Sequence, residues 1–193
     1  MSKRAILLHG TSGSVADHWF PWLKDALQAS GYDVLAPSLP GNNAPNKDRY
    51  DAYLRSLMWD YEGSLVVGHS SGATTALNLL MQDWFPRVRA VVLVGVFLNE
   101  RLVKSADWYV NGQFDKLFPD NGFNVDVIKQ KAGRIYIIHG DDDPYCSYDD
   151  AKEFAEKLGA TFIVVPNGQH LGVASGLKEL PVIIETMLKD EVL

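Results

Sequence analysis

The sequence predicts a doubly wound α/β fold, in which helices cover both faces of a parallel sheet. Short runs rich in Val, Ile and Leu recur and are continuously apolar, as strands covered on both faces tend to be. Amphipathic helical patterns lie between these runs, and alternating strands and helices are typical of parallel sheets. With 193 residues, 47% of them hydrophobic, the chain is long enough to bury one sizeable core. We therefore expect a single domain over residues 1–193.

Six segments have the strand pattern: 5–9, 32–37, 64–68, 90–95, 134–140 and 161–166. Five others carry apolar residues at the i, i+3, i+4 spacing of an amphipathic helix. They run from Trp19 to Leu27, from Tyr50 to Tyr61, over 72–84, from Ala151 to Leu158, and from Leu180 to Leu188. The order of these segments is that of repeated βα units.

The connection after the fourth strand is much longer than the others and carries the aromatic residues Trp108, Tyr109, Phe114, Phe118 and Phe123 among polar and turn residues. Long excursions from a compact domain are usually functional. We expect a small cap or pocket segment over 96–131, with helical pieces near 100–110 and 124–131, and with Trp108 and Phe114 in the pocket. The alternative is a plain crossover helix with surface loops.

The stretch Gly68-His69-Ser70-Ser71-Gly72 matches G-x-S-x-G and joins an apolar strand to a helical pattern. In that context the motif forms a tight turn that exposes a serine hydroxyl at the carboxyl end of the sheet. Both glycines then relieve crowding around a strained residue. A plain helix N-cap is the alternative, and it explains a serine but not the two glycines. Ser70 is the candidate nucleophile.

A serine hydroxyl needs a base within hydrogen-bonding reach, and a third group must orient that base. Of the five histidines, His170 follows the last strand and therefore lies at the same edge of the sheet as Ser70. Asp141, Asp142 and Asp143 follow the fifth strand at that edge. Because successive side chains of an extended chain point to opposite sides, at most one of the three should face the site. For the same reason they make an unconvincing metal cluster, and no metal or cofactor is expected.

Two backbone N–H groups are candidates to stabilise the oxyanion of acyl transfer. Ser71 follows the nucleophile at the positive end of its helix, and Thr11 lies in the glycine turn after the first strand, with Ser12 as a second choice. That turn lacks the lysine of a phosphate-binding P-loop, which argues against nucleotide binding.

The motifs "APSLPGN", "VVGHSSGA", "GDDDPYCSYDDAKEFAEKLGA" and "NGQHLG" resemble those of small serine hydrolases of the α/β hydrolase superfamily, similar to retinoblastoma-binding protein nine and its bacterial relatives. The resemblance implies an α/β-hydrolase fold with about six parallel strands and a minimal cap. It also implies Ser70 as nucleophile, Asp143 as orienting acid and His170 as base. Gly95-Val96-Phe97 stands where such proteins tend to have Val-Ser-Ala, so substrate preference does not carry over, and retinoblastoma binding is not implied.

Composition and charge limit the classes of binding partner that we expect. The formal charge is −6 and the chain has no basic block, so nucleic acid is not an expected partner. No apolar run is long enough for a membrane helix, the N-terminus does not read as a secretion signal, and Cys146 is the single cysteine, so we expect a cytoplasmic protein.

We expect a serine hydrolase that cleaves a small ester, thioester or amide through an acyl-enzyme intermediate. Esterase activity is expected in preference to peptidase or amidase activity. Its expected partner is a small acyl substrate. The alternatives are a non-catalytic binding protein on the same fold and an acyltransferase.

Overall fold

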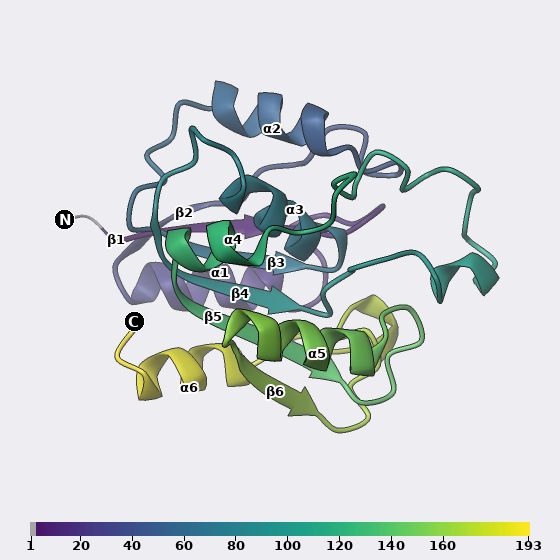
Figure 1. Cartoon of the computed structure of the whole chain (residues 1–193). Coiled ribbons are helices and arrows are strands. Elements are labelled where there is room, and N and C mark those ends of the chain that lie inside the picture. The colour runs from purple at the N-terminus through teal and green to yellow at the C-terminus, as the bar shows by residue number, and fades with distance from the viewer. Residues whose placement is uncertain (1–2) are drawn as a thin grey trace.

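The computed structural model describes residues 3–193, which form one six-stranded, fully parallel sheet (Figure 1). The strands are β1 (Lys3–Leu8), β2 (Tyr32–Leu35), β3 (Leu65–His69), β4 (Val88–Val94), β5 (Ala132–Gly140) and β6 (Thr161–Val165). Their spatial order is β2-β1-β3-β4-β5-β6. Each overlaps a segment expected from the sequence, so the prediction of six parallel strands is confirmed.

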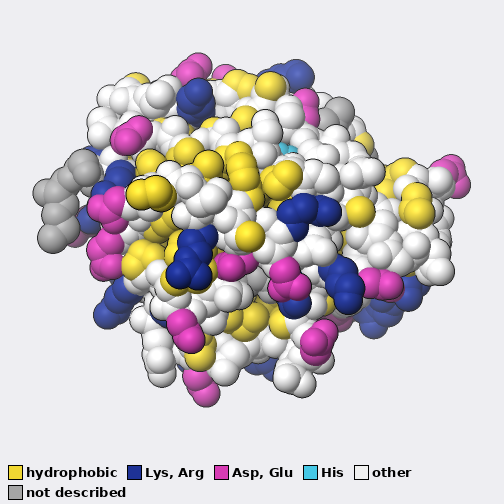
Figure 2. Space-filling view, turned by 90° about the horizontal axis from the view of Figure 1, so that it is seen from above, with side chains coloured by type: hydrophobic (Ala, Val, Ile, Leu, Met, Phe, Trp, Pro, Cys, Tyr) yellow, Lys and Arg dark blue, Asp and Glu magenta, His cyan; other side chains and the backbone are white. Residues whose placement is uncertain are grey.

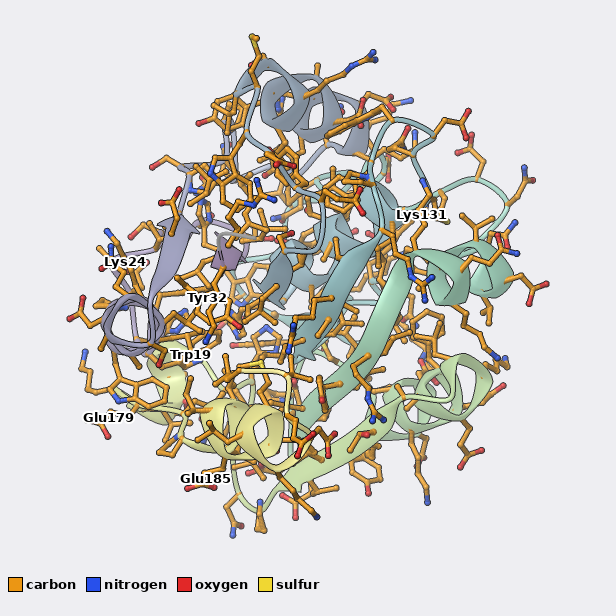
Figure 3. The ribbon with its side chains drawn as sticks, turned by 90° about the vertical axis from the view of Figure 1, so that its left-hand side faces the viewer. Trp19, Lys24, Tyr32, Lys131, Glu179 and Glu185 are labelled. Atoms are coloured by element: carbon orange, nitrogen blue, oxygen red, sulfur yellow. The ribbon has the colours of Figure 1, made fainter. Side chains whose placement is uncertain are left out.

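Helices cover both faces of this sheet (Figure 3). One face packs against α1 (Phe20–Ala29) and α6 (Val182–Lys189). The other packs against α2 (Lys47–Ser56), α3 (Ser71–Leu80), α4 (Val125–Lys131) and α5 (Tyr148–Leu158). Every residue of α3 is buried, as is every residue of β3 before it, so both elements that flank the turn at Ser70 are anchored in the core.

Two helices end earlier than their apolar pattern suggests. The pattern that runs to Tyr61 belongs to α2 only as far as Ser56, since Met58 has φ of +50°, a left-handed conformation that ends a helix. Tyr61 is still buried, and its hydroxyl donates to the Leu54 carbonyl at 2.8 Å. Trp84 likewise follows the end of α3. In both places the apolar pattern continues past the end of the helix because the residues that follow still pack against the core.

The connection after β4 contains less helix than expected. The helical piece expected near 100–110 is reduced to one 3-10 turn, η1 (Val103–Ser105), whereas α4 matches the piece expected at 124–131. The segment is instead held by an apolar cluster of its own, made of Phe97, Val103, Phe114, Leu117 and Cys146. Packed aromatic side chains thus replace helical hydrogen bonds as its support. The segment projects beyond the carboxyl ends of the strands, at the right of Figure 1.

On the face that α2 covers, acidic and basic side chains are interspersed among apolar ones (Figure 2). A second 3-10 turn, η2 (Val173–Ser175), leads from the last strand toward α6. None of the helices formed by residues 3–193 combines the length and the apolar character needed to cross a bilayer.

Candidate active site

Ser70 lies on a sharp turn between β3 and α3 and has φ of +57° and ψ of −126°. A Cβ atom on Gly72 would lie 2.1 Å from the Leu8 carbonyl oxygen, and one on Gly68 would lie 2.5 Å from the Gly72 carbonyl oxygen. No side chain fits at either glycine, which confirms the physical reason given for this motif. The Ser70 side chain makes no capping hydrogen bond, so the N-cap alternative does not explain it.

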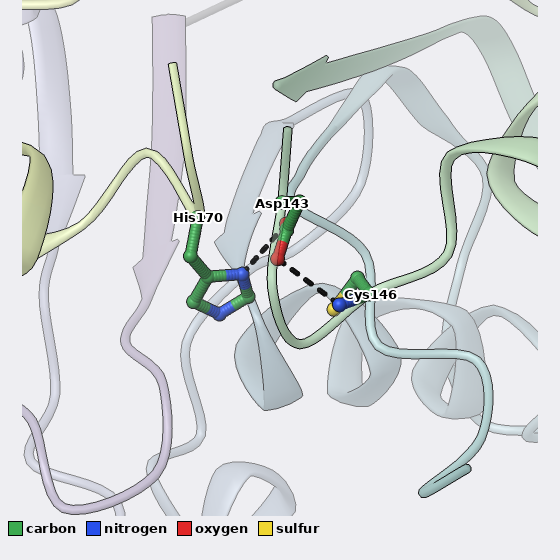
Figure 4. A group of neighbouring side chains, drawn as sticks. All are labelled: Asp143, Cys146 and His170. Carbon is green, nitrogen blue, oxygen red and sulfur yellow. Dashed lines mark hydrogen bonds and ion pairs between the residues drawn. The ribbon is translucent and has the colours of Figure 1, made fainter. Parts of the chain in front are cut away.

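The structure brings Ser70, His170 and Asp143 into one line of hydrogen bonds. His170 Nε2 lies 2.9 Å from Ser70 Oγ, and His170 Nδ1 lies 2.8 Å from Asp143 Oδ2. The Asp143 side chain is fully buried. Its Oδ1 accepts the N–H groups of Tyr145 at 2.9 Å and of Cys146 at 3.0 Å, and Figure 4 draws the second of these contacts. With Nδ1–H donated to Asp143, Nε2 is left to accept the Ser70 hydroxyl proton.

Two further histidines pack beside His170. His69 Nε2–H donates to the His170 carbonyl at 2.8 Å, and burial lowers the pKa of His69 well below its ordinary value. Burial also lowers the pKa of His18 to about 4, and its ring lies 4.9 Å from that of His69. Both rings are therefore neutral at pH 7 and add no positive charge next to His170.

The other two histidines hold turns. His9 Nδ1–H donates to the Gly10 carbonyl at 2.9 Å, while Nε2 accepts the Leu39 N–H at 2.9 Å. His139 Nδ1–H donates to the Gly140 carbonyl at 2.7 Å. Burial lowers the pKa of both side chains. Each ring is thus used by the backbone around it, and neither is recorded as a partner of the Ser70 hydroxyl.

Cys146 is the other nucleophilic side chain near this site. Burial raises the pKa of its thiol well above the ordinary value, with Asp143 adding to the effect, and Sγ lies 3.4 Å from the Gly95 carbonyl oxygen. A protonated, buried thiol is a poor nucleophile. Ligand atoms of Asp143, Cys146 and His170 lie within 4.8 Å of one another, but both Asp143 oxygens already accept N–H donors. The arrangement favours hydrogen bonding over metal binding.

The turn after β1 lies directly beside the start of α3, where the Thr11 hydroxyl donates to Ser71 Oγ at 2.9 Å. The Ser12 N–H donates a hydrogen bond to the Asn42 carbonyl oxygen at 3.1 Å. Within residues 3–193, the backbone N–H groups of Thr11 and Ser71 have no recorded acceptor. Thr11 is thereby favoured over Ser12 as a donor to a bound oxyanion.

A cavity of about 450 Å³ opens next to Ser70 and His170. The projecting segment supplies most of its apolar wall, and the two expected pocket residues, Trp108 and Phe114, lie in that wall. The remaining apolar lining includes Phe97, Val103, Val110, Tyr145 and Ala174. The polar part of the lining includes Thr11, Ser12, Asp17, His18, Asn43 and Gln113.

The lining also contains residues that the sequence does not place in the pocket, among them Phe97, His18 and Tyr145. Phe97 belongs to the Gly95-Val96-Phe97 departure from the family pattern, and its ring lies 4.7 Å from that of Phe114. The His18 ring lies 4.9 Å from that of His69, and the Tyr145 ring lies 5.2 Å from that of His170. The signal in the sequence for a different pocket wall is the departure from the family pattern at Gly95-Val96-Phe97, directly after β4.

Comparison with known proteins finds relatives whose names include the word hydrolase. YdeN of Bacillus subtilis (strain 168) is 25% identical over 193 residues, which cover 97% of this chain and 95% of YdeN. Serine hydrolase RBBP9 of Rattus norvegicus is 24% identical over 160 residues, 81% of each chain. The resemblance seen in the sequence motifs is therefore confirmed.

Solved structures show the same fold. The crystal structure of the ydeN gene product from B. subtilis matches with a TM-score of 0.84 at 22% identity over 97% of each chain. MGS-MChE2, an α/β hydrolase enzyme from a sediment metagenome, matches with a TM-score of 0.73 at 18% identity, over 100% of this chain and 93% of that one. The expected α/β-hydrolase fold is confirmed. The family model described as serine hydrolase matches residues 5–189, nearly the whole chain, and the chain belongs to the serine hydrolase family.

Proposed function

We propose that the protein is an esterase that cleaves small carboxylic esters through an acyl-enzyme formed on Ser70. The observation that carries the proposal is the unbroken line from Ser70 Oγ through His170 to the buried Asp143 carboxylate, with heavy-atom distances of 2.9 and 2.8 Å. A nucleophile within reach of a base that a third group orients is the arrangement that serine acyl transfer requires.

In the first half-reaction, Ser70 Oγ attacks the ester carbonyl carbon while His170 Nε2 takes the hydroxyl proton. Asp143 stabilises the imidazolium that forms. The oxyanion of the tetrahedral intermediate accepts the N–H groups of Thr11 and Ser71, and each such donor is worth roughly 3 kcal/mol of transition-state stabilisation. His170 then protonates the leaving alcohol as its C–O bond breaks, which leaves the acyl group on Ser70.

In the second half-reaction, water attacks the acyl-enzyme. His170 Nε2 takes a proton from the water and returns it to Ser70 Oγ as the acid product leaves. The apolar wall that Phe97, Trp108 and Phe114 give the cavity favours an apolar acyl group, and about 450 Å³ suits a small substrate. Thioesters and amides share this chemistry and are the other substrate classes to compare.

The test is turnover of p-nitrophenyl esters of graded acyl length together with labelling by a fluorophosphonate. Wild type should hydrolyse short esters and gain the mass of one probe on Ser70. Ser70→Ala should lose at least about 10³-fold in kcat and resist the probe. The control is Ser56→Ala, which removes an exposed serine and should leave both readouts unchanged.

Equal turnover by wild type and Ser70→Ala would contradict the proposal, as would a probe adduct on another residue. An inert wild type would point to a binding protein on the same fold. Transfer of the acyl group to an added alcohol or amine in preference to water would point to an acyltransferase.

A further inference from the structure

We propose that Asp141 and Asp142 are positioning residues that hold the His170 loop in place for Ser70. This inference rests on the proposed function, because the loop matters for activity only where His170 is the base. The two aspartates directly precede Asp143, so the three consecutive carboxylates share one task.

Each of these carboxylates contacts the loop after β6. Asp141 Oδ1 accepts the Asn167 backbone N–H at 2.7 Å, and Asp142 Oδ1 accepts the Gln169 backbone N–H at 2.7 Å. Asp143 holds the ring of His170, the next residue along. Residues 141 and 142 lie in a turn, where side chains do not alternate as they do along a strand, so both can point to the same loop.

The loop has a backbone conformation that needs outside support. Asn167, Gln169 and Leu171 have φ of +55°, +48° and +52°, in the left-handed region that residues with a side chain rarely adopt. Such conformations persist only where the surroundings over-determine them. Carboxylate acceptors suit this purpose because their hydrogen bonds to backbone N–H groups are stronger than neutral ones.

The opposite side of the loop is fixed as well. His69 Nε2–H donates to the His170 carbonyl at 2.8 Å, and Trp19 Nε1–H donates to the Leu171 carbonyl at 2.8 Å. The end of β5 leaves no space behind the loop, since a Cβ atom on Gly140 would lie 2.1 Å from the Gln169 carbonyl oxygen. Asp141 and Asp142 therefore bind backbone N–H groups of the loop, while His69 and Trp19 bind its carbonyl groups.

The experiment compares Asp141→Ala/Asp142→Ala with Asp141→Asn/Asp142→Asn, because asparagine keeps the Oδ1 acceptor. We expect the double alanine variant to lose about 10- to 100-fold in kcat for a p-nitrophenyl ester, with KM within about twofold, since a base displaced by about 1 Å costs that much. The asparagine variant should recover most of kcat. The control is Asp149→Ala, which changes an exposed aspartate in α5 whose side chain forms no hydrogen bond within residues 3–193, and it should match wild type.

A second readout does not depend on activity. The proton of an imidazole N–H held by a carboxylate gives a far-downfield NMR signal when it exchanges slowly with water. The signal of His170 should persist in wild type and in Ser70→Ala, and should weaken or vanish in the double alanine variant while thermal unfolding shows that the variant is folded.

Unchanged kcat and an unchanged imidazole signal in the folded double alanine variant would overturn the inference. So would an asparagine variant as impaired as the alanine one. A wild type without esterase activity would refute the proposed function alone, and the NMR comparison would still decide whether these aspartates hold His170.

Discussion

At the scale of single residues, the site depends on close backbone approach. Ser70 carries a strained conformation that costs on the order of 1–3 kcal/mol and persists because its neighbours leave no alternative. Gly72 lets the start of α3 pass over the end of β1, and Gly68 lets β3 pass beneath α3. The G-x-S-x-G spacing is therefore a packing requirement, whatever chemistry Ser70 performs.

Gly72→Ala should destabilise the protein by about 3 kcal/mol or more, because its Cβ atom would lie 2.1 Å from the rigid Leu8 carbonyl oxygen. Gly13→Ala is the matched control, since a Cβ atom there would meet its nearest neighbour at 3.5 Å, and it should change stability by less than about 1 kcal/mol. Urea unfolding measures both. Similar unfolding midpoints for the two variants would mean that the backbone at Gly72 can move aside.

The identity of the candidate acid could not be predicted from the pattern of single residues alone. Ser70 and His170 follow from their motif and from the sheet edge, but direction alone left Asp141, Asp142 and Asp143 open, and the family resemblance selected Asp143. The structure places Asp143 Oδ2 at 2.8 Å from the His170 ring. The backbone contacts of Asp141 and Asp142 depend on how two loops meet, which no local pattern encodes.

At the scale of elements, the segment between β4 and α4 gives the cavity its shape. It contains one short 3-10 turn, and the cluster around Phe97, Phe114 and Leu117 takes the place of a regular element. The aromatic content of the segment predicts a pocket wall, but not that wall's conformation. A segment without regular periodicity has no repeating hydrogen bonds to fix it, so packing against its neighbours decides its path.

Phe114→Leu should enlarge the cavity and shift hydrolysis toward esters with a longer acyl chain, because the Phe114 ring is buried and lines the cavity. Phe118→Leu removes a ring from the same cluster that is not part of the cavity lining. Both variants should lose about 1 kcal/mol of stability, but only Phe114→Leu should change the profile of kcat/KM against acyl length. Identical profiles would assign Phe114 a purely structural role.

At the scale of the whole molecule, the sheet order assembles the site. The loops after β1, β3, β5 and β6 all leave the carboxyl edge of one parallel sheet, which brings Ser70 to His170 across a separation of 100 residues. Three fully or nearly fully buried histidines, His9, His69 and His139, lie at the ends of strands there. Burial lowers the pKa of all three, which links the stability of this edge to pH.

Stability should fall as the pH drops from 7.5 to 5. Below the unfolded-state pKa of about 6.5 the unfolded chain binds more protons at His9, His69 and His139 than the folded chain does, so unfolding is favoured. Each fully linked histidine contributes up to about 1.4 kcal/mol per pH unit, and the stability is complete only above pH 6.5 or so. Urea unfolding across this range should show the loss.

His9→Gln is the matching variant, because glutamine can both donate to the Gly10 carbonyl and accept the Leu39 N–H without titrating. It should flatten the dependence of the unfolding free energy on pH. A wild-type unfolding free energy that stays constant between pH 7.5 and 5 would contradict the role given to these histidines.

The sequence by itself determined which segments form strands and that these strands are parallel. It also determined the turn at Ser70 and the edge of the sheet where the partners of Ser70 lie. Those features follow from short-range patterns: apolar periodicity, paired glycines, and residues placed directly after strands. Only the tertiary structure decided where α2 and α3 end, how the segment after β4 folds, and which groups hold the His170 loop. These depend on contacts between segments far apart in the chain, such as Trp19 Nε1 with the Leu171 carbonyl, 152 residues away.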